Sequence, residues 1–101
     1  MKTNRFIYVA MVSIFFLVSC AANLEIRKNR EEALRNLGEA YMGQGDYTAA
    51  LRELLKAEKL YSKDHQLQND LGVVYIAKGN PDIAIDHFKK AIKIKPDYTQ
   101  A

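Results

Sequence analysis

A repeat of 34 residues constrains the fold of this chain more than any other feature. Residues 31–64 align with residues 65–98 without a gap, and eight aligned pairs are identical. A repeat of this length is typical of proteins whose units pack only against their neighbours. Two units fill most of the 101 residues, which leaves no room for a second domain. The identical pairs are Leu37/Leu71, Gly38/Gly72, Tyr41/Tyr75, Gly45/Gly79, Ala50/Ala84, Lys56/Lys90, Ala57/Ala91 and Lys59/Lys93.

Each unit is predicted to form a helical hairpin, because its apolar residues recur at helical spacing. We expect helices near residues 31–44, 47–61, 65–78 and 81–94. Gly45 and Gly79 interrupt the helical pattern between the members of each pair. Asp46 and Asn80 are the expected N-caps, and Pro81 suits the first helical position. The fold class is therefore all-α.

Small and large residues alternate between the helices in a way that predicts close packing. The small ones are expected where paired helices approach closely, and the large ones are expected to fill the remaining space. Their role is to build the fold. The small residues are Gly38, Gly72, Ala50 and Ala84, and the large ones are Tyr41, Tyr75, Leu54 and Phe88.

This pattern resembles the tetratricopeptide repeat, whose signature is Leu-Gly-x-x-Tyr, a Gly with a polar residue, Ala, an aromatic or aliphatic residue, Ala and Pro. The first unit has Ser62 in place of the Pro, and neither unit has the frequent Trp. The resemblance implies a helical-hairpin solenoid with two full repeats, 31–64 and 65–98, and the start of a third at 99–101. The second unit carries Leu71, Gly72, Tyr75, Gly79, Asn80, Ala84, Phe88, Ala91 and Pro96.

The first 19 residues have the organisation of an export signal. Lys2 and Arg5 precede an apolar run over residues 6–18 that only Ser13 interrupts. A run of 13 residues is short for a spanning helix, which needs about 20, and has the length of a signal-peptide core. We predict a signal peptide over residues 1–19.

The residues that end this run resemble the lipobox of bacterial lipoproteins: Leu17-Val18-Ser19-Cys20. The resemblance implies that the Cys20 thiol is acylated, that the chain is cut before it, and that the new amine is acylated as well. Cys20 is the only cysteine. Ala21, where an Asp would favour inner-membrane retention, favours the outer membrane, with the protein facing the periplasm. Two alternatives remain: ordinary cleavage within Ser19-Cys20-Ala21, or an uncleaved anchor.

Residues 20–30 are predicted to link the lipidated Cys20 to the first repeat. A fully extended stretch of ten residues spans at most roughly 35 Å. Asn23 is an alternative N-cap for an early helix, which would shorten the link. The basic residues Arg27, Lys28 and Arg30 are expected on a solvated helix face, with contact to anionic headgroups as the alternative.

The first helices of the two repeats are expected to line a concave groove, as the family resemblance implies. Glu39 and Asp70 would repel a carboxylate, which argues against binding of a peptide C-terminus. The apolar members Met42, Val73 and Ile76 suit an apolar segment of a partner, and their alternative role is packing between repeats. The expected groove residues are Glu32, Arg35, Glu39, Met42, Gln66, Asn69, Val73 and Ile76.

Composition and motifs exclude several other functions. From Cys20 onward the chain has 13 basic and 12 acidic residues with interspersed signs, which argues against nucleic-acid binding. His65 and His87 have no metal-ligand partners at suitable spacing and are expected on the surface. The sequence therefore predicts no catalytic residue, no cofactor and no metal site.

The last residues, 97–101, read as the beginning of a third repeat, with Thr99 as its N-cap. The helix over 81–94 would then keep an uncovered apolar side at Ile85, Phe88 and Ile92. We expect a fragment of a longer solenoid, or a dimer through this open end.

The combined features predict a lipid-anchored scaffold that binds proteins of a bacterial envelope. A lipobox followed directly by such repeats resembles the type IV pilus biogenesis lipoproteins, the pilotins of secretin rings. Two alternatives are an adaptor for peptidoglycan enzymes or outer-membrane barrel assembly, and an enzyme whose catalytic domain lies beyond residue 101.

Overall fold

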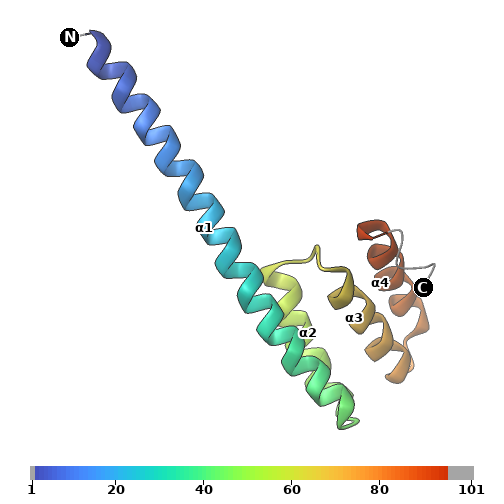
Figure 1. Cartoon of the computed structure of the whole chain (residues 1–101). Helices are drawn as coiled ribbons and strands as arrows, with labels where there is room; N and C mark the ends of the chain where they lie inside the picture. Colours follow the sequence, from blue (N-terminus) through green and yellow to red (C-terminus); the bar gives the residue numbers. More distant parts are fainter. Residues whose placement is uncertain (1, 96–101) are drawn as a thin grey trace.

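A computed structural model describes residues 2–95, and these residues form four α-helices without a strand. The helices are α1 (Lys2–Gly43), α2 (Tyr47–Leu60), α3 (His65–Ala77) and α4 (Pro81–Ile94). They pair as two antiparallel hairpins, α1 with α2 and α3 with α4, which stand side by side (Figure 1). Between the two hairpins, α3 packs mainly against α2 and also touches α1. The predicted all-α helical-hairpin solenoid is confirmed.

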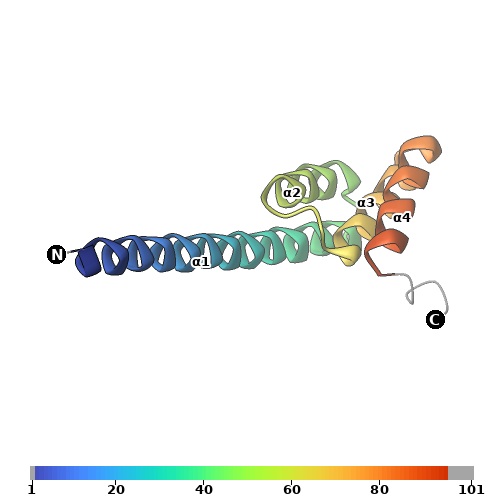
Figure 2. The same ribbon diagram turned by 90° about the horizontal axis from the view of Figure 1, so that it is seen from above.

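The first helix is much longer than predicted. It runs without a break from Lys2 to Gly43, so its N-terminal half projects beyond the hairpins as a single rod (Figure 2). The expected helix start near residue 31 is wrong, because no Gly or Pro occurs between Lys2 and Leu37 to end the helical pattern. Residues 21–30 are therefore helical and span about 15 Å along the axis, less than half of the extended estimate.

The projecting part of α1 is exposed and apolar. It contains one helical stretch long and apolar enough to cross a membrane, with a mean hydropathy of 2.1. This stretch lies near the N-terminus and is not buried against the hairpins. A signal sequence near an N-terminus has the same properties, so the two interpretations stay open.

The turns within the hairpins follow the sequence closely. Gly45 and Gly79 have φ angles of 76° and 80°, a region that favours glycine. The Asp46 side chain accepts a hydrogen bond from the Ala49 amide at 3.1 Å, as predicted for an N-cap. Asn80 is the N-cap residue of α4, as predicted, but its side chain makes no such hydrogen bond. The start of α4 is favoured instead by Pro81, whose ring fixes φ at a helical value, and by the acidic Asp82 in the first turn.

The core lies between the hairpins and confirms the predicted packing. A methyl group added at Gly38 would lie 2.7 Å from Leu54, and one at Gly72 would lie 2.5 Å from Phe88. Both glycines therefore allow a close approach of two helices. Six apolar residues form the buried centre: Ala50, Leu54, Ala57, Leu67, Leu71 and Val74.

His87 is buried, which contradicts its predicted surface position. Its ring stacks on Tyr75 with 5.4 Å between centroids, and its Nδ1 lies 2.7 Å from Gln68 Oε1. The prediction failed because the lack of metal ligands says nothing about exposure. His87 lies three residues after the buried Ala84, on the face of α4 that packs against α3. Burial lowers the pKa of His87.

The outer face of α4 is uncovered, as the repeat pattern predicted for two of its three residues. Ile85 and Ile92 are exposed, whereas Phe88 is half-buried against Gly72. Phe88 therefore belongs to the hairpin interior. The predicted start of a third repeat, including Thr99, lies outside the described residues.

Candidate functional site

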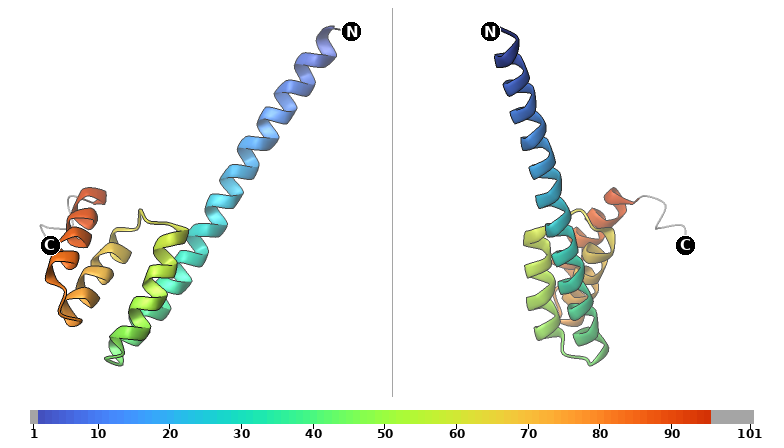
Figure 3. Two further views of the ribbon diagram at one scale, coloured as in Figure 1. Left: turned by 180° about the vertical axis from the view of Figure 1, so that it is seen from behind. Right: turned by 60° about the vertical axis from the view of Figure 1, so that its left-hand side comes forward.

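The predicted groove residues all lie on α1 and α3. These are the first helices of the two hairpins, which Figure 3 shows from two further directions. The structure separates them by exposure, and only half of them are freely accessible from solvent. Glu32, Gln66, Val73 and Ile76 are exposed, Glu39, Met42 and Asn69 are half-buried, and Arg35 is buried.

Arg35 is the centre of an ionic network between α1 and the start of α3. Its Nη1 donates to Glu39 Oε1 at 2.7 Å, one helical turn along α1. Its Nε lies 2.9 Å from Asp64 Oδ2, across the hairpin boundary, and 3.8 Å from Glu31 Oε1. With 8% of its surface exposed, Arg35 is more a structural residue than an open ligand contact.

Asp64 has two roles that the sequence pattern did not predict. It is the N-cap of α3, because its Oδ1 accepts a hydrogen bond from the Gln66 amide at 2.9 Å. Its other carboxylate oxygen pairs with Arg35. An Asp directly before an expected helix start was the available signal for the cap, whereas nothing in the repeat pattern indicated the ion pair.

Gln66 adds a second polar connection between the two first helices. Its Nε2 donates to Glu39 Oε1 at 3.0 Å, the same oxygen that accepts from Arg35. The predicted groove residues Arg35, Glu39 and Gln66 are thus brought together by direct contacts. This end of the predicted groove is therefore polar, and its side chains are held by hydrogen bonds to one another.

Acidic groups outnumber the single guanidinium in this network. Asp70 is 8% exposed, and burial followed by a hydrogen bond with Glu39 raises its pKa to about 8. Glu31 is 3% exposed, and burial followed by the charge of Asp64 raises its pKa to about 7. Both carboxyl groups therefore keep a proton near neutral pH in a substantial fraction of molecules. Each also has one buried oxygen without a hydrogen-bond partner among the described residues, Glu31 Oε1 and Asp70 Oδ2.

The apolar end of the groove is smaller than predicted. Met42 packs against the buried core, so the alternative interpretation of packing holds for this residue. Val73 and Ile76 are 39% and 56% exposed and lie one turn apart on α3. These two side chains are the accessible apolar surface of the groove.

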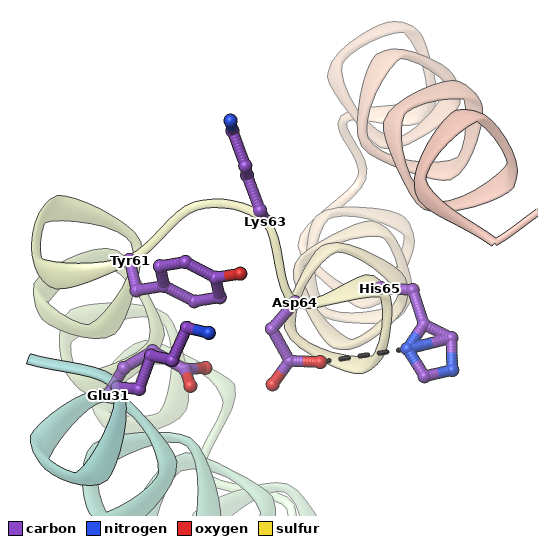
Figure 4. A pocket seen from close by; sticks show the side chains of 6 residues that line it. Glu31, Tyr61, Lys63, Asp64 and His65 are labelled. Atoms are coloured by element: carbon purple, nitrogen blue, oxygen red, sulfur yellow. Dashed lines mark ion pairs between the residues drawn. The ribbon is translucent and has the colours of Figure 1, made fainter. Parts of the chain in front are cut away.

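A shallow recess of about 260 Å³ opens beside the turn between α2 and α3 (Figure 4). Its wall holds two lysines, an aromatic ring, two carboxylates and a histidine: Lys28, Lys63, Tyr61, Glu31, Asp64 and His65. The Lys28 ammonium lies 5.1 Å from the centre of the Tyr61 ring, and His65 Nδ1 lies 3.7 Å from Asp64 Oδ1. The described residues contain no group of three or more His, Cys, Asp or Glu side chains suited to a metal ion.

Comparisons with known proteins agree with this architecture. A family profile described as "Tetratricopeptide repeat" matches residues 29–97, about two thirds of the chain. The chain is also similar to a protein of Homo sapiens named DnaJ homolog subfamily C member 3, with 34% identity over 76 residues. The alignment covers 75% of this chain and 15% of that protein, so the chain spans a small part of its relative.

Proposed function

The chain belongs to the tetratricopeptide repeat family, and from this premise we propose that it is a membrane-anchored scaffold for protein–protein interactions in a bacterial envelope. Proteins of this family serve as interaction scaffolds, and their typical role is non-catalytic. The observation that carries the proposal is the continuity of α1, which contains the apolar leader, Cys20 and the first wall of the groove in one helix.

This continuity supports anchoring at a short and defined distance from the membrane. Cys20 is exposed on α1, where a modifying enzyme has access to its thiol. The helical stretch over residues 21–30 spans about 15 Å, which supports a short distance between the proposed attachment point and the first repeat. Several acyl chains on Cys20 provide stable attachment. An uncleaved leader that spans the membrane is the second candidate, and the length and hydropathy of α1 favour it as well.

The groove chemistry supports an amphipathic partner segment. Val73 and Ile76 offer an apolar contact, whereas Glu39 and Gln66 offer polar groups about two helical turns away. A partner segment would match both ends of the predicted groove if it carried an apolar side chain and, about two helical turns away, an amide or a basic group. The surrounding carboxylates disfavour a partner that presents a carboxylate.

The partner class follows from the resemblance to envelope lipoproteins. A lipobox followed by these repeats favours a role in type IV pilus or secretin assembly at the outer membrane, in the manner of a pilotin. The alternatives are an adaptor for peptidoglycan enzymes or outer-membrane barrel assembly, and the N-terminal part of a protein with a catalytic domain beyond residue 101. The presence of pilus genes next to this gene would favour the first role, and a catalytic sequence downstream of codon 101 would favour the last.

The anchoring part is tested by Cys20→Ser in a bacterial host. We expect loss of fatty-acid labelling and accumulation of the unprocessed precursor, with Ser13→Ala as the matched control. Normal labelling and processing of the Cys20→Ser protein would contradict lipid attachment.

The groove part is tested by photo-crosslinking in intact cells. The double variant Val73→Glu/Ile76→Glu should lose its crosslinked partner, whereas Ile85→Glu/Ile92→Glu on the outer face of α4 should keep it. Circular dichroism of both variants confirms that they fold. A folded groove variant that captures its partner as well as the wild type rules out this surface.

A further inference from the structure

Positive charge gathers at one edge of the two hairpins, although the signs alternate along the sequence. Helices α2 and α4 run in parallel, so their C-terminal ends lie at the same edge, next to the turn over residues 61–64. Figure 1 shows that this edge faces the side from which the N-terminal half of α1 projects. We name it the basic edge, formed by Arg27, Lys28, Lys59, Lys63, Lys90 and Lys93.

Three shallow recesses bring these six cations together. One lies between α1 and the end of α2, the second lies beside the 61–64 turn, and the third lies between that turn and the end of α4. The third recess holds about 280 Å³ and is lined by three lysines against one carboxylate, Glu58. Lys63 borders all three recesses, so the positive charge is continuous from α1 to α4.

Three carboxyl groups near this edge have partners within the protein, and one of them, Glu58, also lines two of the recesses. Asp64 pairs with Arg35, and Glu58 accepts a hydrogen bond from Gln68 at 3.0 Å. Glu31 is buried and shares a hydrogen bond with Asp64. Among the described residues, none of Lys59, Lys63 and Lys93 lies within ion-pair distance of a carboxylate. Their charges therefore remain available to a ligand.

The opposite edge of the hairpins has a different charge. It contains the two turns that connect α1 to α2 and α3 to α4, where Asp46 and Asp82 oppose Lys78. The two edges of the hairpins therefore differ in net charge, and the positive edge is the one nearer to the projecting half of α1. Helix C-termini favour nearby cations, which explains single lysines such as Lys59 and Lys93 at the helix ends. That effect does not explain Arg27, Lys28 and Lys63, which lie outside the last turns of α2 and α4.

We propose that the basic edge docks onto the anionic headgroups of the membrane to which α1 is attached, through acylated Cys20 or through an uncleaved apolar leader. The inference rests on the proposed membrane attachment. Arg27 lies about 10 Å along the helix axis from Cys20, which is close to the distance over which charges act at physiological salt. Each lysine held near an anionic surface adds to the attraction. Docking at this edge orients the groove between α1 and α3 relative to the membrane.

The test uses the full chain mixed with two kinds of vesicle, phosphatidylcholine alone and phosphatidylcholine with phosphatidylglycerol. Flotation reports attachment, and the rate of lysine acetylation, measured by mass spectrometry, reports docking. With phosphatidylglycerol present, we expect Lys59 and Lys93 to react roughly fivefold more slowly relative to Lys78. High salt should remove this difference.

The outcomes separate the inference from the proposed attachment. Flotation with both vesicles and selective protection with phosphatidylglycerol support both. Flotation with both vesicles and equal reaction of all lysines overturns docking alone, and the edge then belongs to another acidic partner. If the protein floats only with vesicles that contain phosphatidylglycerol, and the two lysines are protected, docking is supported and the apolar anchor is overturned. If it floats only with those vesicles but the lysines are not protected, both are overturned. Absence of flotation overturns both as well.

A pair of variants with equal charge change provides the control. In these variants, protection is the ratio of the Lys63 reaction rates with the two kinds of vesicle. Lys59→Gln/Lys93→Gln should lose this protection, whereas Arg52→Gln/Lys78→Gln should keep it. Both variants are checked by circular dichroism. Equal protection of Lys63 in the two variants would show that the basic edge does not carry the interaction.

Discussion

The Nε atom of Arg35 lies 2.9 Å from Oδ2 of Asp64, and this contact ties the middle of α1 to the N-terminus of α3. The two residues are 29 positions apart in the sequence. Asp64 also caps α3, so one side chain both starts the second hairpin and attaches it to the first. The relative position of the two groove walls therefore depends on a buried charge and its acidic partners.

Arg35→Ala is expected to lower the free energy of unfolding by about 3 kcal/mol, because it leaves one buried carboxyl group, Glu31, and two half-buried ones, Glu39 and Asp64, without their cation. Urea unfolding at neutral pH measures the change. Arg30→Ala, an exposed arginine on the same helix, is the control and should change stability by less than about 0.5 kcal/mol. Similar losses in both variants would show that Arg35 is no more important than a surface charge.

Asp70→Asn is expected to weaken the pH dependence of stability. The pKa of Asp70 is raised from 3.8 to about 8 in the folded protein, so the folded state holds a proton that the unfolded state has lost. The stability of the wild type should therefore fall as pH rises from 6.5 to about 8, and then level off. This window lies above the titration of His87, whose pKa is lowered by burial.

Urea midpoints at intervals between pH 6.5 and pH 9 test this prediction. The Asp70→Asn protein should be the more stable of the two above pH 8, because its buried amide carries no charge. Glu31, with a pKa of about 7, also makes stability fall with rising pH, but at lower pH than Asp70. The Glu31→Gln variant separates the contribution of Glu31 from that of Asp70. Parallel curves for the wild type and Asp70→Asn would refute the protonated carboxyl.

Gly72→Ala is expected to destabilise the second hairpin by about 1–3 kcal/mol. Its methyl group would lie 2.5 Å from the Phe88 ring, so α3 and α4 must move apart. Gly43→Ala is the matched control, because a methyl group there meets no atom within 4 Å. It should leave stability unchanged or increase it, since alanine favours a helix. Thermal unfolding of both proteins measures the difference, and a neutral Gly72→Ala would disprove the close approach.

The hairpins were predictable because their causes are local or periodic. The turn glycines Gly45 and Gly79 and the N-cap at Asp46 act on backbone within a few residues of themselves. The 34-residue repeat shows the same pattern twice, so each unit supports the prediction for the other. The small residues Gly38 and Gly72 were also predictable, since the repeat places them opposite Leu54 and Phe88. The start of α1 was not, because a continuous helical pattern contains no signal that separates the leader from the first repeat.

The sequence alone thus determined the helices, their pairing in hairpins and the residues that pack between them, because helix formation and repeat packing follow from local composition and period. Only the tertiary structure decided which polar groups are buried and which charges gather. Arg35 meets Asp64, and Gln68 meets His87, only after the hairpins have formed and stacked. The free energy of a buried charge depends on all the groups around it. It is therefore set by the assembled fold and not by any single residue.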